Sequence, residues 1–469
     1  VTTQRAGTSF AIVEARDALG GTWDLFRYPG IRSDSDLYTF GYEFKPWLDK
    51  NAIASADKIL AYLQETAAEN GIDAAIRYDH RVVAASWSSI DARWTVEMES
   101  AGERTTLTCG WIFSATGYYD YEQGYTPHFE GRDSFQGLVV HPQQWPEDLD
   151  HAGKRVVVIG SGATAVTLVP ALADAAEHVT LLQRTPSYIL SVPGQDKLVQ
   201  RLQKLLGEER AHPWARRKGI AVQRAIWSFC QKYPDRARKI IRWTNAKQLP
   251  EGYPVDTHFN PPYDPWDQRL CIVPDGDLFR TLRSGDASIV TDHIARFVET
   301  GIELTSGEVL EADIIVTATG LNLLPFGGID LTVDGEPVDL SERVSFKGMM
   351  LSGVPNLAYA IGYTNSSWTL KVGLLCEHFC RILEHMADRG LDTCVPTLDD
   401  EHMATRPLLD FGAGYVQRSL SALPRQGESA PWVTSMSYHG DVKLLRKMPV
   451  VDPHLSFTTS RAATVAAGR

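Results

Sequence analysis

A short glycine-rich turn near the middle of the chain has the residue types and spacing that bind a pyrophosphate. It follows a β-branched run that ends at Ile159 and has the pattern GxGxxA. The pattern consists of Gly160, Ser161, Gly162, Ala163, Thr164 and Ala165. The glycines permit a tight turn and close backbone approach to the phosphates, and the following helix offers unpaired N–H groups. The pattern therefore predicts a strand, a turn and a helix that bind a dinucleotide.

The residue expected to contact the ribose of that dinucleotide is basic. The next predicted strand, His178 to Gln183, is followed by Arg184, which lies 24 residues after Gly160. An acidic residue at this distance suits a ribose 2′-hydroxyl, whereas an arginine suits a 2′-phosphate. We therefore expect NADPH rather than NADH, with Arg184 and Thr185 providing the selectivity.

A second ribose-contacting residue is predicted close to the beginning of the chain. The stretch Ser9 to Glu14 predicts a buried strand with an acidic end, and a Gly-Gly turn follows it. By the spacing found between Gly160 and Arg184, the glycine loop that belongs with Glu14 would begin before residue 1. We expect either a start downstream of the natural N-terminus or a domain without its first phosphate-binding loop.

The elements that must position these residues alternate between strand and helix. The length of 469 residues corresponds to two or three domains at about 150 residues each. The tripeptide ATG follows a predicted strand twice, at Ala115 and at Ala318. Because alternating strands and helices are typical of α/β folds, we expect two interleaved dinucleotide-binding, Rossmann-like domains with a helical insertion.

The helical insertion is basic within an acidic chain. The formal net charge is −12, which makes nucleic acid an unfavourable partner for the chain as a whole. The segment Asp196 to Lys247 nevertheless contains 14 Lys or Arg against 4 Asp or Glu. Apolar residues alternate with these cations at helical spacing: Leu198, Leu202, Leu205, Ile220, Ile226 and Trp227. We favour a solvated helical face that covers the active site, and peripheral membrane contact is the alternative.

Cysteine usage and hydropathy indicate the compartment. The six cysteines include no CxxC pair, which fits free thiols in a reducing compartment. Cys376, His378 and Cys380 are close in sequence, but no second ligand pair accompanies them, so we expect no metal site. No apolar run approaches the roughly 18 residues that a membrane span needs, and we expect a cytoplasmic protein.

A longer motif precedes the glycine-rich turn and carries a family resemblance. The segment FQGLVVHPQQWP fits FxGxxxHxxxWP through Phe135, Gly137, His141, Trp145 and Pro146. It resembles the fingerprint of Baeyer–Villiger monooxygenases. Trp145 followed by Pro146 is the feature that separates these enzymes from the related flavin-containing monooxygenases.

Further motifs extend the resemblance over nearly the whole chain. Gly20, Gly21, Thr22 and Trp23 match a GG(T/V)W turn that lies against FAD in the family, and Tyr28 to Asp34 matches a YPGxRxD segment near the flavin. The segments Asn365 to Lys371 (NSSWTLK) and LPRQG from Leu423 are most similar to the ethionamide-activating monooxygenases of mycobacteria. From its acidic side chain at a strand end, Glu14 is also expected to belong to the cofactor site. Asn365, Ser366 and Ser367 are N-cap candidates for a helix start that faces the flavin, and an ordinary helix cap is the alternative.

The resemblance implies an activity and roles for individual residues. Family members use NADPH, FAD and O₂ to insert one oxygen atom into a ketone, giving an ester or lactone, and oxidise sulfides or thioamides as a side activity. Arg269 occupies the place of the family's catalytic arginine, with Gln268 where many members have Lys. Asp34 is expected to be a buried carboxylate that orients Arg269. His141 is expected to be structural or to move between the domains.

The resemblance also implies a domain organisation and leaves alternatives. Residues 1–150 are expected to form the first part of the FAD-binding domain, 151–325 the NADPH-binding domain with its insertion at about 195–250, and 326–469 the rest of the FAD-binding domain and a tail. One alternative is a flavin monooxygenase that oxygenates sulfur or nitrogen. Another is a non-catalytic nucleotide-binding remnant without a complete FAD site.

Overall fold

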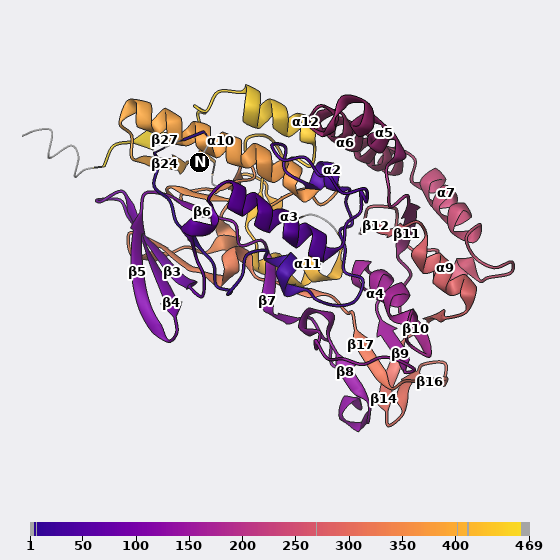
Figure 1. Cartoon of the computed structure of the whole chain (residues 1–469). Helices are drawn as coiled ribbons and strands as arrows, with labels where there is room; N and C mark the ends of the chain where they lie inside the picture. Colours follow the sequence, from indigo (N-terminus) through magenta and orange to yellow (C-terminus); the bar gives the residue numbers. More distant parts are fainter. Residues whose placement is uncertain (1–3, 6, 269, 401, 410–411, 461–469) are drawn as a thin grey trace, which may run out of the picture.

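The structure is a computed structural model that describes residues 4–5, 7–268, 270–400, 402–409 and 412–460 (Figure 1). Strands β3, β4 and β5 lie at one side of the molecule, and β8, β9, β10 and β17 lie at the other. Helices separate and cover these groups of strands. The architecture is an α/β fold, as the alternating sequence pattern predicts.

A five-stranded parallel sheet is built around the glycine-rich turn. Its strand order is β13-β10-β9-β17-β8, and all of its pairs are parallel. The strands and their helices are β8 (Leu138–Val140), β9 (Arg155–Ile159), α4 (Ala163–Ala173), β10 (His178–Gln183), α9 (Asp277–Ser284), β13 (Ala287–Thr291) and β17 (Ile314–Thr317). The central strands are almost wholly buried, as expected for a parallel sheet with both faces covered. The predicted strand, turn and helix at Arg155 to Ala165 are confirmed.

Two small sheets flank this parallel sheet. The first is antiparallel and consists of β14 (Ile294–Val298), β15 (Gly301–Leu304) and β16 (Val309–Glu311). The second pairs β11 (Tyr188–Val192) with β12 (Leu270–Pro274) in parallel.

Two further sheets combine strands that precede the parallel sheet in sequence with strands that follow it, which confirms that the two domains are interleaved. One sheet has the order β21-β22-β23-β6 and the other β20-β19-β3-β4-β5. Their strands are β3 (Arg81–Ser88), β4 (Arg93–Ser100), β5 (Glu103–Cys109), β6 (Ile112–Ser114), β19 (Asp330–Val333), β20 (Glu336–Pro337), β21 (Ser345–Phe346), β22 (Met350–Leu351) and β23 (Leu357–Tyr359). Within the second sheet, β3 and β4 pair as an antiparallel hairpin.

The predicted strand at Ser9 to Glu14 is shorter and more exposed than expected. Only β1 (Ile12–Val13) is formed, and it pairs in parallel with β2 (Ile76–Arg77). Phe10 is 41% exposed and Ile12 37% exposed. Within the described residues β1 pairs with β2 alone. Its other edge therefore has no neighbouring strand to cover it, and the stretch is not buried.

Two antiparallel segments carry the chain between the sheet groups. They are β7 (Tyr119–Gly124) and β18 (Leu321–Leu323), which pair with each other. We call this pair the crossing segments. Because β8 follows β7 and already belongs to the parallel sheet, that sheet begins before residue 151, the position that the sequence suggested as a boundary.

The helical insertion forms a separate layer at one edge of the molecule. It comprises α5 (Lys197–Leu206), α6 (Glu208–Lys232) and α7 (Pro234–Ala246), drawn at the upper right of Figure 1. Other helices are α1 (Thr22–Leu25), α2 (Leu37–Phe40), α3 (Ala56–Glu69), α8 (Val255–His258), α10 (Trp368–Arg389), α11 (Gly414–Ser419) and α12 (Tyr438–Asp441). The described C-terminal strands are β24 (Thr393–Pro396), β25 (Arg406–Pro407), β26 (Arg425–Gln426) and β27 (Leu455–Thr458). In the described part of the chain, no helix is both long and apolar enough to span a bilayer.

Candidate functional site

The glycine-rich turn has the backbone geometry of a phosphate-binding loop. Gly160 has φ 138°, and a Cβ atom there would lie 2.3 Å from the carbonyl oxygen of Ala318. Gly162 is the N-cap residue of α4 and has no side chain to occupy the first N–H groups of the helix. A side chain at Gly160 is thus excluded, and the N-terminus of α4 keeps the unpaired donors that bind anions.

The glycine turn is joined to the end of the neighbouring strand β10. The hydroxyl of Ser161 donates to the carbonyl oxygen of Thr185 at 2.9 Å and lies 2.9 Å from the hydroxyl of Ser187. Arg184, next to Thr185, is exposed. The predicted phosphate-binding residues and the predicted ribose-contacting arginine are therefore brought together at the carboxyl edge of the parallel sheet, where ligands bind in such folds.

The YPGxRxD segment docks against this nucleotide-binding unit. Tyr28 is buried in the core around α4, and its hydroxyl forms a hydrogen bond with the side chain of Thr164. Burial raises the pKa of Tyr28 to about 12. Gly30 has φ 77°, and a Cβ atom there would lie 2.7 Å from the Cβ of Ala171. The turn at Gly30 therefore packs directly on α4 and leaves room only for glycine.

An ion pair completes this contact between the two halves of the molecule. Nη1 of Arg32 lies 2.5 Å from Oδ2 of Asp277, the first residue of α9, and both side chains are largely buried. Burial of a pair in a low-dielectric setting makes loss of either partner costly. Arg32 thus links the predicted flavin-side segment to the parallel sheet domain.

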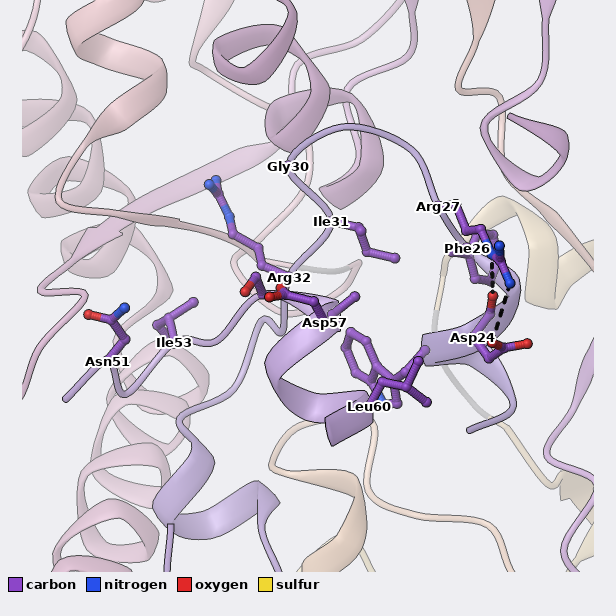
Figure 2. A pocket seen from close by; sticks show the side chains of 13 residues that line it. Asp24, Phe26, Arg27, Gly30, Ile31, Arg32, Asn51, Ile53, Asp57 and Leu60 are labelled. Carbon is purple, nitrogen blue, oxygen red and sulfur yellow. Dashed lines mark hydrogen bonds and ion pairs between the residues drawn. The ribbon is translucent and has the colours of Figure 1, made fainter. Parts of the chain in front are cut away.

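Two of the motifs that resemble FAD-contacting segments line one cavity (Figure 2). The cavity has a volume of about 690 Å³ and lies between the GGTW turn, the turn at Gly30 and the beginning of α3. Its walls include Trp23, Ile31, Arg32 and Asp57. Gly21, at φ 54°, turns the chain into α1, and the hydroxyl of Thr22 lies 3.1 Å from that of Tyr121 in β7.

Glu14 directly follows β1, and its carboxylate has a local partner. Oε1 of Glu14 accepts a hydrogen bond from the backbone N–H of Arg16 at 3.0 Å. The backbone of Glu14 continues the pairing with β2, because its N–H donates to the carbonyl oxygen of Arg77. Glu14 is therefore held at the end of β1.

The fingerprint motif lies against both crossing segments. The ring of His141 lies so close to Gly124, at the end of β7, that a Cβ atom there would be 1.9 Å from Cε1 of the ring. Nε2 of His141 lies 3.1 Å from the carbonyl oxygen of Gly320, just before β18. Nδ1 accepts a hydrogen bond from the N–H of Gln143 at 3.1 Å, so Nε2 carries the proton and donates to Gly320.

The other fingerprint residues pack around the parallel sheet. Phe135 is buried in a core cluster with Phe297. A Cβ atom at Gly137 would lie 2.4 Å from the carbonyl oxygen of Asp313. Trp145 packs against the core that contains α4. Because burial lowers the pKa of His141, its imidazole is neutral near pH 7, which suits a structural contact at the crossing segments.

The turn before α10 contains a buried acceptor without a partner. Nδ2 of Asn365 donates to the carbonyl oxygen of Met436 at 3.0 Å, whereas Oδ1 is buried and has no hydrogen bond within the described residues. Ser367, the N-cap residue of α10, makes no side-chain cap bond, because its hydroxyl lies 2.6 Å from that of Thr39. The turn thus presents an unsatisfied amide oxygen and free helix N–H groups, a combination that needs a ligand or water.

The same turn is connected to the helical insertion by Gln223 of α6. Its Oε1 accepts hydrogen bonds from the Ser366 hydroxyl at 2.6 Å and from the backbone N–H of Ser367 at 3.1 Å. Its Nε2 donates to Oδ2 of Asp36 at 2.8 Å. The sequence offered no signal for Gln223, because a lone glutamine in a basic helix is ordinary.

The less exposed carboxylate of this region is Asp36, whereas the sequence suggested Asp34. Asp34 is exposed, and its Oδ1 accepts a hydrogen bond from the Ser35 hydroxyl at 3.5 Å. Asp36 caps α2 by accepting from the N–H of Thr39 at 3.0 Å, and burial raises its pKa. Capping explains the difference, since the N-cap position turns Asp36 inward. Arg269 lies outside the described residues.

The comparisons with known proteins identify the family. Residues 43–327 match the family described as flavin-binding monooxygenase-like. The chain is 53% identical over 450 residues to the FAD-containing monooxygenase EthA of Mycobacterium tuberculosis (strain ATCC 25618 / H37Rv), with coverage of 96% of this chain and 92% of the relative. The chain belongs to the flavin-binding monooxygenase-like family. This membership confirms the resemblance found in the sequence motifs.

A second relative and two solved structures agree with this assignment. The probable FAD-binding monooxygenase AlmA of Acinetobacter baylyi is 47% identical, with coverage of 96% of this chain and 90% of the relative. A steroid monooxygenase bound to NADP has a TM-score of 0.76 at 21% identity, covering 97% and 96% of the two chains. OTEMO in complex with FAD and NADP also reaches a TM-score of 0.76, at 20% identity and 97% and 95% coverage. At these identities the two structures establish the fold, which confirms the two-domain α/β prediction.

Proposed function

We propose that the protein is an NADPH- and FAD-dependent Baeyer–Villiger monooxygenase, which inserts one oxygen atom of O₂ into a ketone to give an ester or lactone. Oxygenation of sulfides or thioamides is the expected side activity. The observation that carries the proposal is the fingerprint motif, whose His141 contacts both crossing segments between the sheet groups. The family and the named relatives support flavin monooxygenase chemistry.

The parallel sheet domain fits NADPH. Gly160 lets the turn approach the backbone of Ala318, Gly162 leaves space for a pyrophosphate at the N-terminus of α4, and the exposed Arg184 at the same edge offers a guanidinium to the 2′-phosphate. Ser161 holds the backbone of Thr185 in place beside it. The bound NADP in two similarly folded proteins supports this assignment.

The other half fits FAD through residues contributed by distant segments. Oδ1 of Asn365, which has no hydrogen bond in the described part of the chain, offers an acceptor, and the N-terminus of α10 offers donors. Glu14 directly follows β1, and Gly21 and Trp23 turn the chain beside the cavity in Figure 2. Bound by these residues, FAD would supply the redox chemistry between NADPH and O₂.

The residues of the chain then have three tasks in the reaction. Arg184 and the glycine turn bind the NADPH phosphates. The contacts of Tyr28 with α4 and of Arg32 with α9 fix the position of the flavin-side segment relative to the parallel sheet domain. Arg269 stabilises the negative charge that develops on the ketone oxygen when oxygen adds to the carbonyl carbon, a role for a permanently charged guanidinium. Asp34 orients Arg269.

The competing activity is oxygenation of sulfur or nitrogen alone. A ketone carbon is electrophilic and needs a nucleophilic oxygen, whereas sulfides react with an electrophilic oxygen. The two activities therefore differ in the charge that the site must stabilise. Trp145 followed by Pro146 in the fingerprint favours the Baeyer–Villiger reaction.

Product analysis with isotopically labelled oxygen tests the proposal. The purified chain, supplied with FAD and NADPH, is incubated under ¹⁸O₂ with a linear ketone, a cyclic ketone and a thioether in separate reactions. We expect an ester and a lactone that each contain one ¹⁸O atom, together with sulfoxide. Sulfoxide formation without any ester or lactone would favour the competing activity and contradict the proposal.

A further inference from the structure

The outer face of the helical insertion concentrates exposed apolar side chains. Among the described residues, eighteen large hydrophobic side chains are exposed, and nine of them lie between residues 198 and 243. These nine are Leu198, Leu205, Leu206, Trp214, Val222, Phe229, Tyr233, Ile240 and Trp243. We call them, with the cations between them, the insertion face. Half of the exposed large apolar side chains thus come from about a tenth of the sequence.

Helical spacing places these residues on the outward sides of all three helices. With about 100° per residue, Leu198 and Leu205 share one side of α5, and Ile240 and Trp243 share one side of α7. In α6, Trp214 and Gln223 are nine residues apart and therefore point in opposite directions. Gln223 faces the interior of the protein, so Trp214, which is 59% exposed, faces outward.

Cations border the apolar stripes. Ten exposed Lys and Arg residues of the insertion have no ion-pair partner within the described part of the chain. They are Lys197, Arg201, Lys204, Arg210, Arg217, Arg224, Lys232, Arg236, Lys239 and Lys247. Several lie over exposed aromatic rings: Lys247 is 3.9 Å from the centroid of Trp243, and Arg217 is 5.8 Å from that of Trp214.

The charge of the insertion face is opposite to that of the rest of the molecule. Residues 196–247 carry 14 cationic and 4 anionic side chains, whereas the whole chain has a net charge of −12. The remainder of the chain is therefore strongly acidic and is repelled by an anionic surface. An anionic surface would thus orient the molecule so that the insertion approaches it first.

We propose that the insertion face binds the surface of an anionic lipid bilayer. Tryptophan and tyrosine at the headgroup level, aliphatic side chains below them and Lys or Arg around them form the pattern of interfacial helices. Five of the nine apolar residues are aliphatic, which a hydrocarbon layer accommodates and a nucleic acid does not require. A solvated helical face that only covers the active site, the interpretation favoured from the sequence, does not explain why nine large apolar side chains are exposed.

The insertion lies next to the proposed active site, so a bilayer contact would place that site near the bilayer. The inward side of α6 contacts the turn before α10 through Gln223, and the outward side carries Trp214 and Phe229. One helix therefore connects the bilayer-binding face with the turn that contains Asn365. A bilayer contact would bring the proposed active site close to lipid-soluble substrates, a step that depends on the proposed function, whereas the binding itself does not.

Vesicle sedimentation of the full chain tests the proposal. Vesicles of phosphatidylcholine alone are compared with vesicles containing equal parts of phosphatidylglycerol and phosphatidylcholine, at low and at high salt. We expect sedimentation only with the anionic vesicles, loss of binding at high salt, and a blue shift of tryptophan emission. Equal binding to both kinds of vesicle, or binding to neither, would overturn the proposal.

Matched variants distinguish this face from the rest of the surface. Trp214→Ser combined with Trp243→Ser should abolish the blue shift and weaken sedimentation, and Lys239→Gln combined with Lys247→Gln should weaken binding by roughly 30-fold. Ile90→Ser combined with Val309→Ser removes exposed apolar residues elsewhere and should leave binding unchanged. The melting temperature shows that each variant is folded.

Two other outcomes would also overturn the proposal. If duplex DNA binds the chain and displaces it from vesicles without any change in tryptophan emission, the face is a polyanion site. If the wild-type chain does not bind vesicles, and the double tryptophan variant has a smaller mass in solution than the wild type, the face is an interface between copies of the chain. Turnover of a water-soluble substrate is the readout for the proposed function, and it should be the same in the tryptophan variant and the wild type.

Discussion

Nε2 of His141 lies 3.1 Å from the carbonyl oxygen of Gly320, while the same ring covers Gly124. Gly124 is the last residue of β7 and Gly320 directly precedes β18, and these two crossing segments run antiparallel between the sheet groups. One side chain therefore contacts both connections through which one half of the molecule could move relative to the other. This contact explains why the fingerprint motif requires a histidine at position 141.

Replacing His141 with alanine should slow turnover without unfolding the protein. The variant loses the hydrogen bond to Gly320 and the one accepted from Gln143, each worth about 1 kcal/mol, and leaves a gap beside Gly124. We expect kcat to fall roughly 5- to 10-fold, mainly in the reduction of flavin by NADPH, as measured by stopped-flow absorbance. His151→Ala, outside the fingerprint, is the control. Unchanged flavin reduction in the His141→Ala variant would show that the contact is not needed.

The two glycines of the phosphate-binding turn should respond differently to alanine. At Gly160 an added Cβ meets a backbone oxygen at 2.3 Å, whereas at Gly162 it would meet no other part of the described chain within 4 Å, apart from its sequence neighbours. Gly160→Ala should therefore lower the melting temperature, and Gly162→Ala should leave it unchanged but weaken NADPH binding, because its methyl group occupies space for the pyrophosphate. Calorimetry and NADPH titration check both results. Normal NADPH affinity in Gly162→Ala would place the pyrophosphate elsewhere.

Arg184 should determine the preference for NADPH over NADH. A charge-assisted hydrogen bond is worth about 1.5–3 kcal/mol, so Arg184→Ala should raise the KM for NADPH roughly 10- to 100-fold. The KM for NADH, which has no 2′-phosphate, should change little. Steady-state kinetics with both cofactors measures the ratio, with the exposed Arg296→Ala as a control. An equal effect on both cofactors would assign Arg184 a structural role instead.

The buried His378 should make stability depend on pH. Burial lowers its pKa to about 4, whereas an unfolded histidine titrates near 6.5. The unfolded state therefore binds the extra proton first, and stability is full above about pH 6.5 and falls as the pH decreases to about 4. The loss attributable to this residue is about 3 kcal/mol. The free energy of unfolding, measured with urea between pH 4 and 7, should depend less steeply on pH in the His378→Gln variant than in the wild type. The exposed His293→Gln variant is the control and should show the same pH dependence as the wild type.

Local motifs made the nucleotide-binding part of the fold predictable. Gly160 to Ala165 followed a β-branched run, and both the strand β9 and the helix α4 are present. The prediction succeeds because the strand, the turn and the helix are neighbours in sequence, and because glycine is required where backbone atoms approach closely. The family resemblance rested on fixed positions of the same local kind, such as Phe135 to Pro146.

Long-range contacts were not predictable from single residues. Gln223 meets Asp36 across 187 positions, and Arg32 meets Asp277 across 245, and nothing in the local sequence marks either pair. Asp34 rather than Asp36 was expected to be buried, because the motif YPGxRxD drew attention to it, whereas the N-cap of α2 determined the actual orientation. The outward stripes of α5, α6 and α7 were visible as periodicity, but only the fold shows which side is covered.

The most direct test of the central claim is the visible absorbance spectrum of the purified chain after incubation with FAD and removal of the excess, followed by addition of NADPH. The account predicts a retained flavin band that bleaches with NADPH under nitrogen and returns when air is admitted. A chain that retains no flavin, or a flavin band that NADPH does not bleach, would contradict it.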